Sequence, residues 1–283
     1  MLLTVFESDR CAPSGAMAVE HSKIGGSSVR NFKPLAMAFA GLLAAGSLSA
    51  QQTGYVQWKG VNGTWAKYGN AATPTTTWSV YTSPYHAAFK IPTNSPASQF
   101  MPPSGTTTFG PTEDIFCVDF IHAANTGTYA ANFTNLGTNA ADIGIKTRTH
   151  TLQQYLESAW LAQEILANGV ATDAAKDING AIWQIMNGQP KYRWTGLTWS
   201  ATGINSWIAA ATSRWNAGTQ TMAGVNAANW VVVTDKLAAA NNTGGSQEYL
   251  TQVVTPEPAT MLLLGTGLLI MMAGAGAVKR FSA

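Results

Sequence analysis

The feature that most constrains this chain is an uncharged stretch near its C-terminal end. Residues 259–278 are all apolar or small, and no charged side chain interrupts them. At a rise of about 1.5 Å per residue, a helix of about twenty residues crosses the hydrocarbon core of a bilayer, which is about 30 Å thick. Lys279 and Arg280 follow the stretch, and paired cations favour the cytoplasmic side. The sequence therefore predicts a transmembrane helix over 259–278, with the preceding residues on the outer side.

The N-terminal region predicts export as well. Lys23, Arg30 and Lys33 precede an apolar run over 34–48, and small residues end that run at Ala50. A basic segment, an apolar segment and a small-residue cleavage site, in that order, are typical of a secretory signal peptide. We expect cleavage after Ala50, so the leader covers 1–50.

A short motif precedes the predicted membrane helix. Pro256, Glu257 and Pro258 come first, the apolar span follows, and Lys279 and Arg280 close the segment. This order resembles the PEP-CTERM sorting signal of Gram-negative bacteria. The resemblance implies export through the inner membrane, a transient membrane anchor, cleavage near the motif by an exosortase, and a role with exopolysaccharide or biofilm at the cell surface or in the extracellular matrix. The alternative is an ordinary C-terminal anchor.

The residues between the two ends form the body of the protein. We divide the chain into the leader 1–50, a body 51–235, a closing strand and linker 236–255, and the sorting tail 256–283. Residues 51–255 hold ten Lys or Arg and ten Asp or Glu. A net charge of zero gives no reason to expect a nucleic acid partner, and no residue pattern predicts a cofactor.

The body shows two kinds of hydrophobic periodicity. Aromatic and β-branched alternation predicts strands near both ends, and apolar spacing of three and four predicts helices in the middle. The predicted fold class is therefore α+β, a β-sandwich or open β-barrel with an inserted helical portion. The expected strands are 55–58, 64–68, 77–81, 115–121, 127–136, 230–234 and 248–254, the expected helices are 151–167, 173–186 and 204–216, and 92–112 is expected to be a surface loop.

Cys117 is the only cysteine left after removal of the leader, because Cys11 lies within it. An unpaired cysteine is unusual in an exported protein. The body carries Tyr-Thr-Ser-Pro-Tyr at 81–85, Phe-Cys-Val-Asp-Phe at 116–120, the helical segment 155–162 and Ile-Asn-Gly-Ala-Ile-Trp at 178–183. In this order, these segments resemble the thioester domains of bacterial surface adhesins.

The resemblance implies a covalent bond between Cys117 and a glutamine of the second helix. Asn179 stands at the glutamine position. Because asparagine is one methylene shorter, the same backbone geometry leaves a gap to the sulfur. A Cys117–Asn179 thioester and a small buried hydrophobic role for Cys117 both remain open.

The same residues are the candidates for catalysis and for metal binding. Cys117 with His86, His122 or His150 could form a nucleophile–base pair, but no known motif surrounds these histidines. Cys117, Asp119 and His122 lack a second ligand pair at zinc-site spacing. We therefore expect no enzyme activity and no metal site.

Four tryptophans are candidates for sugar contact, because aromatic rings stack on sugar rings. They are Trp194, Trp199, Trp207 and Trp215, and the alternative is that they pack in the core. Together these features predict an exported, non-enzymatic surface or matrix protein associated with exopolysaccharide. A covalent adhesin with a Cys117 thioester is the alternative, and a secreted cysteine hydrolase is the third.

Overall fold

A computed structural model describes residues 53–101, 104, 107–239 and 244–253. The predicted cleavage point Ala50, the predicted transmembrane helix 259–278 and the sorting residues Pro256, Glu257, Pro258, Lys279 and Arg280 lie outside these residues. Within the described part of the chain, no helix is long and apolar enough to cross a membrane.

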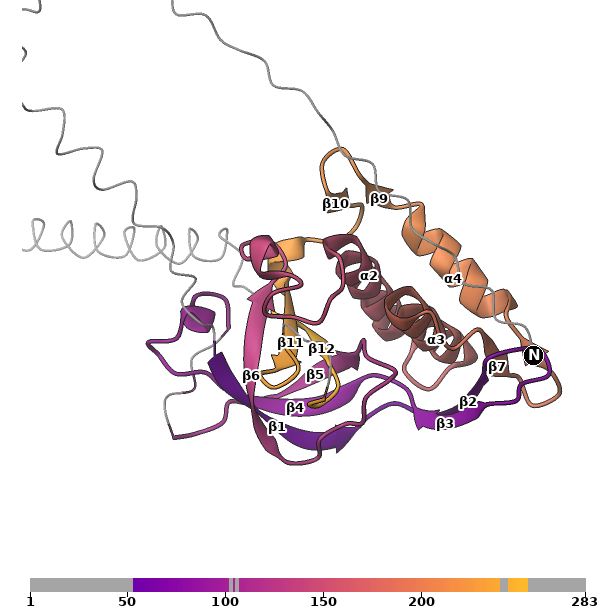
Figure 1. The fold of residues 1–283 in the computed structure, drawn as a ribbon, viewed down its shortest axis with the longest axis horizontal. Helices are drawn as coiled ribbons and strands as arrows, with labels where there is room; N and C mark the ends of the chain where they lie inside the picture. Colours follow the sequence, from indigo (N-terminus) through magenta and orange to yellow (C-terminus); the bar gives the residue numbers. More distant parts are fainter. Residues whose placement is uncertain (1–52, 102–103, 105–106, 240–243, 254–283) are drawn as a thin grey trace, which may run out of the picture. The chain divides into compact units, whose positions relative to one another are not determined.

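Six antiparallel strands form a closed barrel (Figure 1). Around the barrel they follow the order β1-β4-β5-β12-β11-β6. Closure depends on β6, which pairs with β1 on one side and β11 on the other, so that no edge is left unpaired. The strands are β1 (Thr53–Val61), β4 (Tyr85–Lys90), β5 (Thr112–Cys117), β6 (Thr128–Asn135), β11 (Trp230–Asp235) and β12 (Tyr249–Gln252).

A second, four-stranded sheet has the order β3-β2-β7-β8. It contains β2 (Trp65–Gly69), β3 (Thr77–Tyr81), β7 (Tyr192–Trp194) and β8 (Trp199–Ser200). β9 (Trp215–Asn216) and β10 (Thr221–Met222) form a short hairpin. The described residues also contain three short 3₁₀ helices, η1 (Pro96–Gln99), η2 (Ala140–Asp142) and η3 (Ala227–Asn229).

In the described part of the chain, three helices lie between the strands in sequence: α2 (Leu152–Asn168), α3 (Asp173–Asn187) and α4 (Thr202–Thr212). Thr151 starts α2 with a capping box, because its hydroxyl accepts a bond from the Gln154 backbone while the Gln154 side chain accepts one from the Thr151 backbone. Gly188 ends α3 in the left-handed conformation, with φ of 74°. The predicted helices 151–167 and 173–186 are confirmed.

The core has two parts, one inside the barrel and one under the helices. Trp58 of β1 and Tyr249 of β12 belong to strands that are not neighbours, yet their ring centroids lie 6.3 Å apart. Their side chains therefore meet across the barrel interior. Cys117 lies directly opposite Tyr249 in the β5–β12 register, so it faces the same interior.

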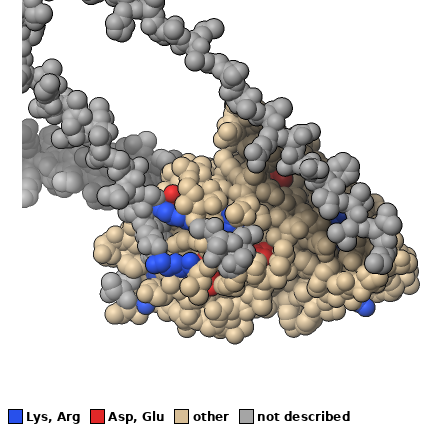
Figure 2. Space-filling model, in the orientation of Figure 1, with Lys and Arg blue, Asp and Glu red and all other residues tan. Residues whose placement is uncertain are grey.

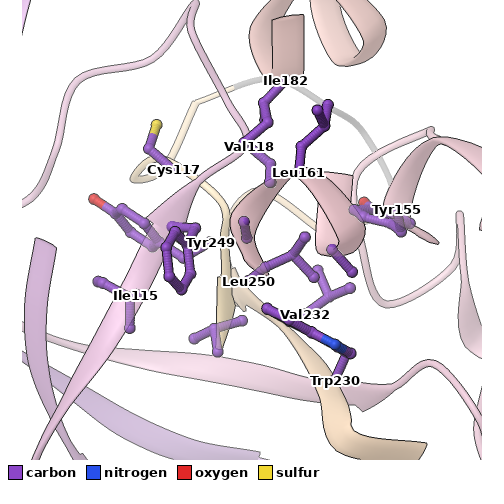
Figure 3. Close-up of a cluster of buried hydrophobic side chains, with 14 of the residues drawn as sticks. Ile115, Cys117, Val118, Tyr155, Leu161, Ile182, Trp230, Val232, Tyr249 and Leu250 are labelled. Atoms are coloured by element: carbon purple, nitrogen blue, oxygen red, sulfur yellow. The ribbon is translucent and has the colours of Figure 1, made fainter. Parts of the chain in front are cut away.

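The other face of β5, β12 and β11 is covered by α2 and α3. Figure 3 shows Leu250 and Trp230 in one cluster with Leu161 of α2 and Ile182 of α3, whereas the sulfur of Cys117 points away from that cluster. Both faces are buried along β11 and over the second half of β5, which explains the apolar runs at 230–233 and 115–118.

Three predictions about the fold need correction. The barrel is closed, where the sequence predicted a sandwich or an open barrel. The predicted strand 115–121 ends at Cys117, because the Asp119 carboxylate accepts hydrogen bonds from the backbone of Ile121 and His122 and turns the chain. The predicted helix 204–216 ends at Thr212. The result is still a β-rich α+β fold, as predicted.

Candidate functional site

Cys117 lies at the end of β5 and is a free, fully buried thiol. Its S–H group donates to the carbonyl of Asp119, with Sγ and O 3.2 Å apart. Its own carbonyl accepts a bond of 3.0 Å from Nε1 of Trp183 on α3. Burial raises the pKa of the Cys117 thiol far above its usual value, and the charge of Asp119 adds to the shift. The thiol is therefore protonated at neutral pH and a poor nucleophile.

Asn179 of α3 reaches Cys117 through Ser83. The Asn179 Oδ1 accepts a bond of 2.9 Å from the Ser83 backbone, and the Ser83 hydroxyl accepts one of 2.9 Å from the Cys117 backbone. The Asn179 amide nitrogen donates to the Ala175 carbonyl. The fold thus brings together the two residues that the thioester resemblance pairs, but both ends of the Asn179 amide bond elsewhere. A covalent link between them stays a prediction.

A buried ionic network lies next to Cys117. Arg148 Nε lies 2.7 Å from Asp119 Oδ2, and both side chains are 1% exposed. The Arg148 backbone donates to Glu248 Oε1, and the Tyr155 hydroxyl donates to Glu248 Oε2 over 2.6 Å. Burial raises the pKa of Glu248, while hydrogen bonds from Thr234 and Tyr155 oppose that shift. Sequence reasoning missed Arg148 and Glu248, because nothing local marks a single charged residue as buried.

The three histidines do not complete a nucleophile–base pair in the described residues. His122 Nδ1 lies 2.7 Å from Asp119 Oδ2, and His86 pairs with Asp114 at 3.2 Å. The Cys117 sulfur donates to a backbone carbonyl, and no described histidine is paired with it. The described part of the chain also contains no group of three or more His, Cys, Asp or Glu residues placed to hold a metal ion.

A second candidate lies on the outward face of the small sheet. Trp65 and Tyr81 are opposite each other on β2 and β3, with ring centroids 4.1 Å apart. They are 54% and 40% exposed, respectively. Trp194 and Trp199 form a similar cross-strand pair on β7 and β8, with centroids 5.4 Å apart. Trp194 and Trp199 are half-buried. A contiguous patch of exposed apolar rings on one face marks a contact surface.

An open groove separates β2 from the turn after β7. It has a volume of about 610 Å³, within the usual range of ligand sites, and Trp65 and Trp194 line it. Asp173, Lys176 and Arg193 add charged groups to its lining. This aromatic groove therefore combines ring faces with hydrogen-bonding groups.

Ion pairs hold the charged lining in place. Arg193 donates from Nε and Nη2 to the two carboxylate oxygens of Asp177, at 2.6 and 3.1 Å. Asp173, whose side chain is 71% exposed, accepts a bond from Lys176. That bond and the charge of Arg193 lower the pKa of Asp173. Asp173 is therefore an ionised hydrogen-bond acceptor at the groove. Lys176 bonds to its carboxylate, which remains exposed to solvent.

The structure brings together two of the four predicted sugar-contact tryptophans. Trp194 and Trp199 share the sheet face, whereas Trp207 lies on α4 and packs on Trp160, with centroids 6.0 Å apart. Trp215 lies in β9 and packs against the core. Sequence reasoning missed Trp65 as a site residue, although its place in an alternating strand was recognised.

No family model, curated protein or solved structure matches this chain. The chemistry of the aromatic groove and of the Cys117 surroundings is therefore the basis for assigning a function.

Proposed function

We propose that this protein is an exported, non-enzymatic component of the cell surface or extracellular matrix, and that it binds polysaccharide in the aromatic groove. The observation that carries the binding function is the pairing of Trp65 and Trp194 with Asp173 and Lys176 around one open groove. Sugar rings have apolar C–H faces that stack on indole rings, and hydroxyl rims that bond to carboxylate and ammonium groups. The groove offers both kinds of contact.

The export part of the proposal depends on the sequence. The predicted signal peptide ending at Ala50 and the tail from Pro256 to Arg280 support secretion, exosortase processing and a membrane anchor before cleavage. A protein sorted in this way meets exopolysaccharide outside the cell. A sugar-binding groove on the body therefore fits the destination that the tail implies.

The second candidate is a covalent adhesin with a thioester at Cys117. It is favoured by the chain of hydrogen bonds that joins Cys117 to Asn179 through Ser83. It is opposed by burial of the thiol and by the other bonds of the Asn179 amide. A thioester would block alkylation of Cys117 even after denaturation, whereas a free thiol would then be alkylated.

A cysteine hydrolase ranks third. The raised pKa of Cys117 opposes attack by the sulfur at neutral pH, and no described histidine hydrogen-bonds to that sulfur. The proposal is therefore a binding protein, and turnover of an ester or amide substrate that Cys117→Ala abolishes would contradict it.

Substitution of the two tryptophans that line the groove tests it directly. We expect Trp65→Ala and Trp194→Ala each to weaken binding of matrix polysaccharide from the producing cells by about tenfold. A lost ring contact is worth up to about 1.5 kcal/mol, and 1.4 kcal/mol corresponds to a tenfold change. Binding is measured by affinity electrophoresis or titration calorimetry of the exported protein.

Tyr55→Ala is the matched control. Tyr55 is an exposed aromatic residue of β1, 40% exposed like Tyr81, and it lines neither the aromatic groove nor its neighbour. Trp207→Ala tests another of the four tryptophans that the sequence suggested. Because Trp207 packs on Trp160 away from the groove, we expect it to leave affinity unchanged. Equal losses for Trp65→Ala and Tyr55→Ala would show that the groove is not the binding site.

A further inference from the structure

The aromatic groove continues into a second hollow. This second hollow has a volume of about 280 Å³ and shares Trp65 and Ser79 with the first. Trp65 therefore borders both hollows, and its ring packs against that of Tyr81. Ser79 adds a small side chain at the junction, so the two hollows meet at a shared border.

The second hollow lies at one mouth of the barrel, at the end where Cys117 is buried. Trp58 and Val61 of β1, Tyr85 of β4 and Gln247, just before β12, line it together with Trp183 of α3. In the register, Val61 pairs with Tyr85 and Cys117 with Tyr249, so these strand ends share one end of the barrel. Barrel mouths are frequent ligand sites.

The chemistry of the second hollow differs from that of the first. It is rich in aromatic rings, and none of its lining residues is charged. Figure 2 shows that charged side chains are sparse on the visible surface of the described residues. An unpaired charge would be costly to place against such a lining. The second hollow therefore favours a neutral sugar ring over a charged one.

Exposed apolar side chains gather at the same place. Val61, Trp65 and Tyr81 are 38%, 54% and 40% exposed, and all three line the second hollow. They belong to three different strands, so the fold, and not one local sequence, brings them together. A cluster of this kind on a body with balanced charge indicates a contact surface.

We propose that the two hollows form one continuous site for an extended neutral polysaccharide, which runs past Trp65 and occupies both hollows. This inference rests on the proposed sugar-binding function and adds the length and charge of the ligand. The first hollow bonds hydroxyl groups through Asp173 and Lys176, and the second stacks ring faces on Tyr81 and its neighbours. A short fragment fills only one hollow, whereas a longer one gains contacts in both.

The test is the dependence of affinity on fragment length. Neutral polysaccharide from the matrix of the producing cells is partly hydrolysed, and fragments of about two and about six sugar units are titrated into the exported protein. We expect the long fragments to bind at least about tenfold more tightly than the short ones. Acidic fragments of the same lengths should gain less from length, because the second hollow offers no countercharge.

Variants of the second hollow make the test specific. Val61→Ser should weaken the long fragments and leave the short ones, which occupy the first hollow, unchanged. Tyr81→Ala should weaken the long fragments by up to about tenfold and the short ones less, because the Tyr81 ring also packs on Trp65. Tyr55→Ala should change neither. Equal affinity for short and long fragments, with both still weakened by Trp65→Ala, would overturn the two-hollow site but leave the proposed function standing. Failure of both the fragments and the intact polymer to bind would overturn the proposed function itself.

Discussion

Replacing Arg148 by Met is expected to lower the free energy of unfolding by about 3–5 kcal/mol, because it leaves the buried Asp119 carboxylate without its arginine partner. The Arg148 side chain is 1% exposed and pairs with Asp119, while its backbone bonds to Glu248. Its Nη2 also donates to the carbonyls of Gly244 and Ser246. For a domain of this size the melting temperature should fall by on the order of 10 °C.

Two further variants identify the cause of this loss. Lys236→Met removes a cation from an exposed position on the chain after β11, and we expect a change within about 0.5 kcal/mol. Arg148→Met combined with Asp119→Asn should recover part of the stability, because the stranded carboxylate becomes a neutral amide. Denaturant unfolding measures all three. A loss below about 1 kcal/mol for Arg148→Met would show that the ion pair contributes little.

Truncation of Trp183 should have an effect of similar size. Trp183 is 1% exposed and packs on Tyr68 and Phe120, with ring centroids 5.4 and 4.9 Å away. Trp183→Ala is expected to cost about 3–5 kcal/mol through the cavity it creates. Trp183→Phe should cost about 1–3 kcal/mol, because it leaves the buried Cys117 carbonyl without its donor.

The rate at which the Cys117 thiol is alkylated gives a second measurement of the contact between Trp183 and Cys117. In the native protein, alkylation of Cys117 should be slow, because the residue is fully buried and its pKa is raised. Trp183→Ala should speed alkylation, and Trp207→Ala, at a half-buried tryptophan on α4, should not. Unchanged alkylation in a folded Trp183→Ala protein would show that Trp183 does not cover the cysteine.

The helices were predictable because their information is local. Apolar spacing, the cap at Thr151 and the stop at Gly188 specify α2 and α3 without reference to the rest of the chain. Closure of the barrel was not predictable, because it depends on pairing of β1 with β6, which lie far apart in sequence. No local pattern distinguishes a closed barrel from a sandwich when both faces of the strands are buried.

The site was predictable only in part for the same reason. Composition identified the tryptophans as candidates for sugar contact. Only the sheet register shows that Trp194 and Trp199 pair on one face of the small sheet whereas Trp207 packs elsewhere, and that Trp65 belongs to the same face. The sequence predicted that the strand continues past Cys117. Asp119 ends it through a carboxylate–backbone turn, which the alternation of residue types does not reveal.

The central claim is that polysaccharide contacts the aromatic groove, and oxidative footprinting of tryptophans tests it most directly. The exported protein is oxidised with and without the matrix polysaccharide, and each tryptophan is quantified by mass spectrometry. We predict that polysaccharide protects Trp65 and Trp194 from oxidation, whereas the buried Trp183 and Trp230 stay unreactive in both samples. Unchanged oxidation of Trp65 and Trp194 in the presence of bound polysaccharide would contradict the proposal.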